Sequence, residues 1–231
     1  MSRLLQLGKL LLAALRSRGD REFYDRIAPI YDRLFTRHHL HAREMVSILS
    51  ENFAGREDTI RILDLGCGTG IVARMLADEG FDTIGLDFSL ESLRQLQQQS
   101  SGIPLVCADA LRLPFLDRSF DVIVSLGAWR HFPRPKGVMA EIDRVMKPGG
   151  MLLIGYFPPA LAGLVPLCDN IPGRVLARFY RGVMKLFGYV DRADFELERE
   201  TLNLAEVSFV KVNSIACSDG RRIISGWKSA E

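Results

Sequence analysis

The sequence predicts an α/β fold in which helices cover a mainly parallel β-sheet. Between residues 58 and 157, short apolar runs alternate with amphipathic stretches, which is the pattern of repeated strand–helix units. No internal repeat or low-complexity linker interrupts this alternation. With 231 residues, of which 48% are hydrophobic and 25% charged, the chain is long enough for one domain with a large buried core.

Five strands and three connecting helices are expected in this central segment. The strands are short runs of β-branched and other apolar residues, and the helices carry apolar residues at helical spacing. The expected strands are 60–65, 83–87, 104–108, 120–126 and 151–156. The expected helices are 71–79, 90–99 and 136–146. Gly80 ends the first helix, and Pro148, Gly149 and Gly150 are expected to form a turn before the fifth strand.

Beyond residue 157 the strand–helix rhythm changes. Several prolines predict an irregular insertion over about residues 158–206, with an amphipathic helix at 174–187 inside it. Strands are expected at 207–217 and 221–227, separated by the turn signal Ser218-Asp219-Gly220. A β-hairpin should therefore close the sheet at its edge.

A glycine-rich loop follows the first expected strand. Glycines at 66, 68 and 70 let the backbone turn sharply and approach a ligand closely, and the next helix would offer its N-terminal amides to that ligand. The spacing G-x-G-x-G after Asp64 differs from the G-x-G-x-x-G of dinucleotide-binding enzymes. The loop indicates a cofactor site, and a plain strand-to-helix turn is the alternative.

Two carboxylates mark the ends of the next strands. Asp87 ends the second strand 21 residues after Gly66, close to the ~20-residue offset at which an acid binds ribose hydroxyls. Its alternative role is to cap the helix that follows. Asp109 ends the third strand, where a carboxylate can accept a hydrogen bond from an exocyclic amine. The ends of parallel strands meet at the crevice where open α/β sheets bind ligands, so these groups should converge.

Longer motifs resemble those of class I S-adenosylmethionine-dependent methyltransferases. ILDLGCGTG (62–70), GLDFSLESL (85–93), CADALRLPFLDRSFDVIVS (107–125) and EIDRVMKPGG (141–150) occur in the order and spacing of that family. YDRIAPIYDRLF (24–35) is similar to a segment of the ubiquinone/menaquinone C-methyltransferases. The resemblance implies a Rossmann-like, seven-stranded mixed sheet with helices on both faces and an N-terminal helical lid. It divides the chain into lid helices at 1–43 and a methyltransferase domain at 44–231.

The resemblance also implies roles for single residues toward S-adenosylmethionine. Asp64 and the three loop glycines would hold the methionine moiety, and Asp87 the ribose hydroxyls. Phe88, Asp109 and Ala110 would contact the adenine. Two tyrosines would line the lid, with ordinary helix packing as their alternative role. The expected cofactor-binding residues are Tyr24, Tyr31, Asp64, Gly66, Gly68, Gly70, Asp87, Phe88, Asp109 and Ala110.

The expected catalytic residue is His131. It follows the fourth strand, near the expected position of the methyl group, and an unperturbed histidine titrates close to neutrality and can serve as a general base. A surface or helix-capping histidine is the alternative, because orientation of the acceptor alone supplies much of the rate in methyl transfer. The cluster His38, His39 and His41 is expected on a solvated helix face.

The cysteines and the first eighteen residues bear on metal content and location. The four cysteines are scattered, with no CxxC pair and no Cys/His cluster at metal-ligand spacing, so we expect a reduced, cytoplasmic protein without a metal. The leucine-rich, basic segment 1–18 predicts an amphipathic helix. Such a helix docks on the domain, lies on an anionic membrane surface, or serves as an organelle presequence, and these readings stay open.

The expected reaction is methyl transfer to a small or amphiphilic metabolite. The hydrophobic N-terminal helix and the apolar insertion favour a quinone- or lipid-like ring. Two observations disfavour a nucleic-acid substrate. The net charge is only +2. After the fourth strand, where amino-directed DNA methyltransferases carry a Pro-Pro-aromatic motif, this chain has Ser125-Leu126-Gly127-Ala128. A cofactor-binding regulatory or assembly protein without catalysis is the main alternative. A nicotinamide-dependent oxidoreductase is the other, and the glycine spacing argues against it.

Overall fold

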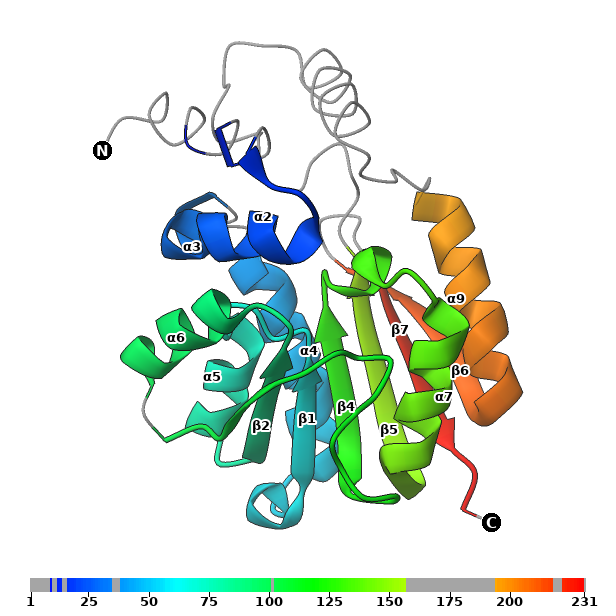
Figure 1. Cartoon of the computed structure of the whole chain (residues 1–231). Helices are drawn as coiled ribbons and strands as arrows, with labels where there is room; N and C mark the ends of the chain where they lie inside the picture. Colours follow the sequence, from blue (N-terminus) through cyan, green and yellow to red (C-terminus); the bar gives the residue numbers. More distant parts are fainter. Residues whose placement is uncertain are drawn as a thin grey trace.

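A seven-stranded mixed sheet forms the centre of the molecule (Figure 1). The computed structural model describes residues 9, 12–13, 16–34, 38–100, 102–156, 194–217 and 222–230. The strand order is β3-β2-β1-β4-β5-β7-β6. The strands are β1 (Arg61–Leu65), β2 (Asp82–Asp87), β3 (Leu105–Cys107), β4 (Phe120–Leu126), β5 (Met146–Tyr156), β6 (Phe209–Ala216) and β7 (Arg222–Lys228). Strand β7 runs antiparallel to both of its neighbours and the other pairs are parallel, so the expected mixed sheet and its closing hairpin are confirmed.

Helices cover both faces of this sheet, as the sequence predicts (Figure 1). α4 and α5 pack on one face, with α6 beside α5, and α7 and α9 pack on the other. The longer helices are α4 (His38–Phe53), α5 (Ile71–Asp78), α6 (Leu90–Gln99), α7 (Pro135–Val145) and α9 (Asp194–Ser208). The short 3-10 helices are η2 (Glu57–Thr59) before β1 and η3 (Trp129–His131) after β4.

Successive side chains of the central strands are buried on opposite faces. On β4, Val122 and Val124 pack toward α4 and α5, whereas Ile123 packs toward α7. This explains why the strand reads as a nearly continuous apolar run: a parallel sheet with helices on both faces has no solvated side. Asp64 on β1 is also buried, and it is one of the few charged residues in this core.

Two of the expected strand boundaries are wrong by more than one residue. β5 begins at Met146 instead of residue 151, because residues 148–150 continue the strand across a bulge. The bulge needs glycine: Gly149 has φ +73°, and a Cβ on Gly150 would lie 2.9 Å from the carbonyl oxygen of Asp121. The expected strand at 207–217 begins at Phe209, since α9 continues to Ser208.

A helical segment lies over the carboxyl ends of the strands (Figure 1). It consists of α2 (Asp20–Ile27), η1 (Ala28–Ile30) and α3 (Tyr31–Leu34), and we call residues 20–34 the lid segment. Its own small core includes Phe23, Ile27 and Ile30. The proposed domain boundary at 43/44 falls inside α4. Most of the segment 1–18 and the expected helix at 174–187 lie outside the described residues.

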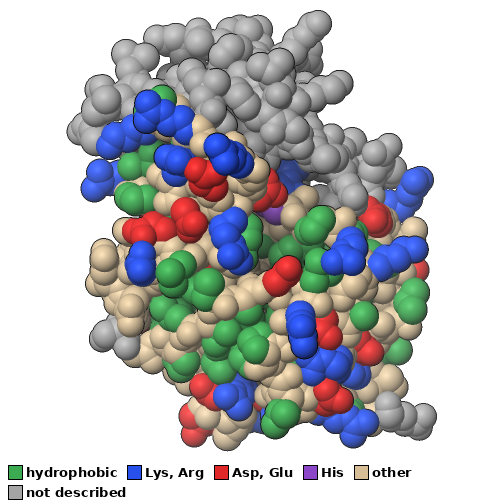
Figure 2. All heavy atoms as spheres, viewed as in Figure 1, with side chains coloured by type: hydrophobic (Ala, Val, Ile, Leu, Met, Phe, Trp, Pro, Cys, Tyr) green, Lys and Arg blue, Asp and Glu red, His purple; other side chains and the backbone are tan. Residues whose placement is uncertain are grey.

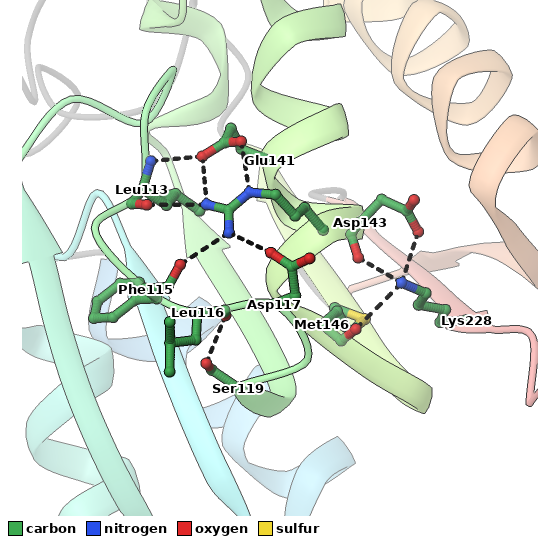
Figure 3. Close-up of polar contacts among 10 residues, drawn as sticks. Leu113, Phe115, Leu116, Asp117, Ser119, Glu141, Asp143, Met146 and Lys228 are labelled. Atoms are coloured by element: carbon green, nitrogen blue, oxygen red, sulfur yellow. Dashed lines mark hydrogen bonds and ion pairs between the residues drawn. The ribbon is translucent and has the colours of Figure 1, made fainter.

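Arg144 fixes the loop that leads from β3 to β4, and its partners Leu113, Phe115, Asp117 and Glu141 are labelled in Figure 3. From α7, its guanidinium donates to the carbonyl oxygens of Leu113 at 3.0 Å and Phe115 at 2.9 Å, and it pairs with the carboxylates of Asp117 and Glu141, both at 2.8 Å. The loop begins beside the candidate site described below. Its anchoring to α7 therefore holds one wall of that site in place.

Candidate functional site

A cavity of about 760 Å³, part of it open to solvent, lies between the lid segment and the carboxyl ends of β1, β2 and β4. A second, narrower pocket adjoins it, and both are lined by Tyr31, Gly66, Gly68 and Thr69. The predicted site residues that line the larger cavity are Tyr24, Tyr31, Gly66, Gly68, Asp87, Phe88, Asp109, Ala110 and His131. Asp64 lines the narrower one. The structure thus brings nearly all of the predicted site together.

The glycine loop has a backbone that only glycine adopts easily. Gly66, Gly68 and Gly70 have φ of +74°, +55° and +83°. The amide of Gly66 donates to the carbonyl oxygen of Leu86 at 2.7 Å, which ties the loop to the end of β2. A Cβ on Gly68 would have no neighbour within 4 Å, so this residue faces the open cavity.

Gly70 differs from the other two glycines of the loop. It lines neither cavity, and a Cβ at this position would lie 2.2 Å from the side chain of Leu96 on α6. Its place at the start of α5 therefore serves close packing of α5 against α6, as the third glycine of a nucleotide-binding loop often does. A direct contact between Gly70 and a cofactor stays a prediction.

Asp64 is a buried carboxylate at the edge of the narrower pocket. It is 1% exposed, and its Oδ2 accepts a hydrogen bond from the amide of Ala73 at 3.0 Å. Its Oδ1 has no hydrogen-bond partner among the described residues. Burial raises the pKa of Asp64 to about 7, and the charge of Asp87 adds to this rise. An oxygen in this state is a ready acceptor for a cationic group.

Asp87 sits between the glycine loop and α6. Its Oδ2 accepts from the amide of Gly68 at 2.8 Å and its Oδ1 from the amide of Ser89 at 2.8 Å. Burial raises its pKa although both hydrogen bonds oppose the rise. The cap of α6 is Ser89, whose side chain accepts from the amide of Ser92, so Asp87 is not the capping residue. Each carboxylate oxygen keeps a lone pair for a further donor.

Two aspartates hold the lid segment onto the body, and both were missed in the sequence. Asp25 accepts from the hydroxyl of Ser89 at 2.6 Å and from the amide of Glu91 at 3.2 Å, at the start of α6. Asp32 accepts from the hydroxyl of Thr69 in the glycine loop. It also lies 3.7 Å from the guanidinium of Arg74 on α5.

The repeat of Tyr-Asp in Tyr24-Asp25 and Tyr31-Asp32 was the available signal. In each pair the tyrosine lines the cavity, and the aspartate bonds to groups around the start of α6 or α5. The sequence alone drew attention only to the tyrosines. The partners of the aspartates come from residues 69–91, and their identity depends on how the lid segment docks.

The wall near β3 contains Phe88, Asp109 and Ala110. Oδ1 of Asp109 accepts from the amide of Leu111 at 2.9 Å, which fixes the loop after β3, and Asp109 itself lines the cavity. The ring of Phe88 lies edge-on to that of Tyr24, with centroids 6.1 Å apart, and the Arg21 guanidinium lies 5.8 Å from the Phe88 centroid. This wall combines a flat aromatic face with one carboxylate oxygen.

His131 does not titrate near neutrality, which corrects the expectation from the sequence. Burial lowers its pKa to about 3, and the charge of Arg130 acts in the same direction. Its Nε2 lies 2.9 Å from the hydroxyl oxygen of Tyr24, which links the wall after β4 to the lid segment. His131 is therefore a neutral imidazole at physiological pH. Its role as catalytic base stays a prediction.

Around this cavity the surface carries no dominant charge. On the part of the molecule that the structure describes, basic and acidic side chains are interspersed on the face shown in Figure 2. Within the same described residues, no helix is long and apolar enough to cross a membrane.

Residues 63–154 match the family model described as "Methyltransferase domain". Similar curated proteins include a demethylmenaquinone methyltransferase of Renibacterium salmoninarum, 40% identical over 97 residues that make up 42% of this chain and 41% of the relative. Another is the demethylmenaquinone methyltransferase of Thermus thermophilus, 33% identical over 130 residues, or 54% of this chain and 59% of the relative. The chain thus spans about half the length of these relatives.

Solved structures share the fold over most of the chain. A candidate S-adenosylmethionine-dependent methyltransferase of Methanococcus maripaludis superimposes with a TM-score of 0.67 at 21% identity, covering 94% of this chain and 96% of its own. A SAM-dependent methyltransferase of Aquifex aeolicus has a TM-score of 0.60 at 15% identity, covering 91% of this chain and 100% of its own. With the glycine loop and the strand order, these findings agree: residues 63–154 match a methyltransferase domain, and the fold is one that solved methyltransferase structures share.

Proposed function

We propose that this protein transfers the methyl group of S-adenosylmethionine to a small apolar ring, with a quinol-like compound as its acceptor. The observation that carries the proposal is the composition of the cavity. Its polar groups gather at the ends of β1, β2 and β3, and its walls near β4 are apolar except for the pair Tyr24 and His131. The names of the curated relatives, which act on demethylmenaquinone, support the acceptor class.

The residues fit the cofactor at each end. Oδ1 of Asp64 would accept from the methionine ammonium, since it is a buried acceptor at the narrower pocket without a partner among the described residues. Asp87 would accept from the two ribose hydroxyls, because each of its oxygens is held by one backbone amide and retains a lone pair. Phe88 and Ala110 would flank the adenine, with Asp109 beside its exocyclic amine.

The lid segment would close over the bound cofactor. Tyr24 and Tyr31 line the cavity from this segment, and Asp25 and Asp32 bond it to the residues around the starts of α6 and α5. These hydrogen bonds join the lid segment to the helices that follow the glycine loop and Asp87. Binding of the cofactor should therefore stabilise the lid segment, and the lid contacts should in turn slow release of the cofactor.

The apolar end of the cavity would receive the acceptor ring. Leu126, Ala128 and Phe132 line it, and they offer no hydrogen bond that would favour a charged or strongly polar substrate. The pair Tyr24–His131 is the polar feature of this wall and could bind a ring hydroxyl. With a pKa of about 3, His131 is better suited to accept that hydrogen bond than to remove the proton completely.

Methyl transfer requires orientation more than a strong base. S-adenosylmethionine supplies an electrophilic methyl group on a sulfonium. The acceptor carbon or oxygen forms a bond to that methyl as the S–CH3 bond breaks, and the acceptor loses one proton. This chain's contribution is to hold the acceptor in line with the S–CH3 bond, which supplies several kcal/mol of the barrier reduction.

The test uses methyl-labelled S-adenosylmethionine and a short-chain demethylmenaquinol kept reduced. The expected result is label in the organic phase, lost in Asp87→Asn and retained in Asp82→Asn, an exposed aspartate at the opposite end of β2. Binding of the cofactor without transfer to any quinol would refute the acceptor class. Binding without transfer to a wide panel of metabolites would favour a regulatory cofactor-binding protein instead.

A further inference from the structure

His41, Glu44 and Cys217 bring three potential metal ligands together outside the cavity. A nitrogen of His41, a carboxylate oxygen of Glu44 and the Sγ of Cys217 all lie within 4.8 Å of one another. His41 and Glu44 come from α4, whereas Cys217 follows β6, far along the chain. The expectation of a solvated histidine face is wrong for His41, which is fully buried. We propose that these three residues form a zinc site.

The fold explains how residues so distant in sequence meet. His41 and Glu44 are three positions apart on α4, so their side chains share one face of the helix. β6 runs in the same direction as β5, because both are antiparallel to β7, and Cys217 therefore emerges at the carboxyl edge of the sheet. On β5, the absence of a side chain at Gly155 leaves room for the histidine ring: a Cβ there would lie 3.2 Å from Cε1 of His41.

The donor set matches zinc. Imidazole nitrogen, carboxylate oxygen and thiolate sulfur are the three ligand types of Zn²⁺, whereas Mg²⁺ and Ca²⁺ select oxygen alone. Bond lengths of about 2.0–2.3 Å in a tetrahedral site place ligand atoms about 3.3–3.6 Å apart. The observed separations need a closure of at most about 1.5 Å, within reach of side-chain rotation at Glu44 and Cys217, which are half-buried.

Charge balance also favours a divalent cation at this place. A carboxylate and a thiolate neutralise the charge of Zn²⁺, and the imidazole binds as a neutral ligand. A metal site without net charge has a smaller desolvation penalty beside the buried face of α4 than a charged one has. Because Glu44 and Cys217 are half-buried, the metal has a path from solvent.

The proposed zinc site lies behind the wall of the cavity, where a bound metal would have a structural role. A Cβ on Gly155 would also lie 2.5 Å from the side chain of Leu126, which lines the cavity, and the amide of Gly127 donates to the carbonyl oxygen of Gly155 at 3.0 Å. Zinc would join α4, the helix next after the lid segment, to the end of β6. It would thereby fix the sheet edge behind the acceptor wall without touching the cavity.

The test titrates chelator-treated full-length protein with Zn²⁺ and, separately, with Co²⁺. We expect one Zn²⁺ per chain, a rise in the unfolding temperature with Zn²⁺, and a thiolate-to-cobalt charge-transfer band with Co²⁺. Cys217→Ser should abolish the band and weaken Zn²⁺ binding by roughly a hundredfold or more. Matched controls are Cys107→Ser, at the exposed last residue of β3, and His39→Gln, on the same helix as His41.

The buried position of His41 calls for a second variant. If His41→Gln fails to fold, Glu44→Gln and Cys217→Ser carry the test, because both residues are half-buried. A stoichiometry far below one, or equal Zn²⁺ affinity in Cys217→Ser and in the two controls, would overturn the proposal. Neither result bears on cofactor binding, which is measured separately.

Discussion

Asp64→Asn should stabilise the cofactor-free protein at neutral pH and weaken its binding of S-adenosylmethionine. In the folded protein burial raises the pKa of Asp64 from 3.8 to about 7. The folded state therefore binds this proton more tightly than the unfolded chain does. Since the group is an acid with a raised pKa, its contribution lowers the free energy of unfolding as pH rises from about 4 to about 7.

The magnitude follows from the size of the pKa change. At about 1.4 kcal/mol per pKa unit, a rise from 3.8 to about 7 corresponds to at most about 4 kcal/mol of lost stability above pH 7. Asparagine does not titrate, but its buried amide would lack a partner, which costs about 1–3 kcal/mol. This second cost is independent of pH. The stability difference between variant and parent should thus grow by about 2.5 kcal/mol from pH 5 to pH 8.

Thermal unfolding of the cofactor-free proteins at pH 5 and pH 8 measures this difference. For a chain of this size, about 2.5 kcal/mol corresponds to about 5–10 °C in unfolding temperature. Asp82→Asn, at an exposed aspartate, is the control and should show no such pH-dependent gain. A stability difference between Asp64→Asn and the parent that is the same at both pH values would show that Asp64 does not titrate with a raised pKa. Loss of a charge-assisted hydrogen bond should also weaken cofactor binding by about 10- to 100-fold.

Four further predictions concern the glycine loop, the lid and the cavity. Asp87→Ala should weaken S-adenosylmethionine binding by more than about tenfold in calorimetry, from loss of charge-assisted hydrogen bonds of about 1.5–3 kcal/mol; unchanged affinity would remove Asp87 from the ribose site. Asp25→Ala and Asp32→Ala each remove a contact between the lid segment and its partners, so each should speed cofactor release in stopped-flow experiments. The far-UV circular dichroism spectrum should stay unchanged. A release rate equal to the parent's would mean that the lid segment does not retain the cofactor. Gly70→Ala should lower the free energy of unfolding, measured by chemical denaturation, by about 2–5 kcal/mol, because φ is +83° and the Leu96 side chain occupies the place of the added Cβ. A decrease below about 1 kcal/mol would contradict the packing role of Gly70. His131→Gln should leave the pH profile of transfer unchanged between pH 6 and 8, since the pKa of His131 is about 3; a profile that loses a limb near neutrality would show that His131 acts as a base.

The strands and the glycine loop could be predicted from the sequence because local patterns determine them. β4 and α6 have the expected bounds, and Gly66 and Gly68 have the backbone that their spacing implied. The start of β5 could not be predicted in this way. Pro148-Gly149-Gly150 is a strong turn signal, and only pairing with β4 across a bulge keeps this segment in the strand.

The parts of the site that escaped prediction depend on contacts between distant segments. Asp25 and Asp32 face groups at residues 69–91, and nothing in their local sequence identifies those partners. The pKa of His131 follows from burial beneath the lid segment, which spacing does not reveal. His41 belongs to a run of polar residues that reads as exposed, yet Gly155 on β5 provides space for its ring.

Isothermal titration calorimetry with S-adenosylhomocysteine measures whether the strand ends bind the cofactor, because this product carries the ammonium and ribose groups without the reactive methyl. We expect one site per chain, with weaker binding in Asp64→Asn and Asp87→Ala. We also expect weaker binding of methylthioadenosine, which lacks the ammonium that Asp64 would bind. Equal affinities of the parent for the two compounds, or no heat with either from folded protein, would contradict binding of the cofactor at the strand ends.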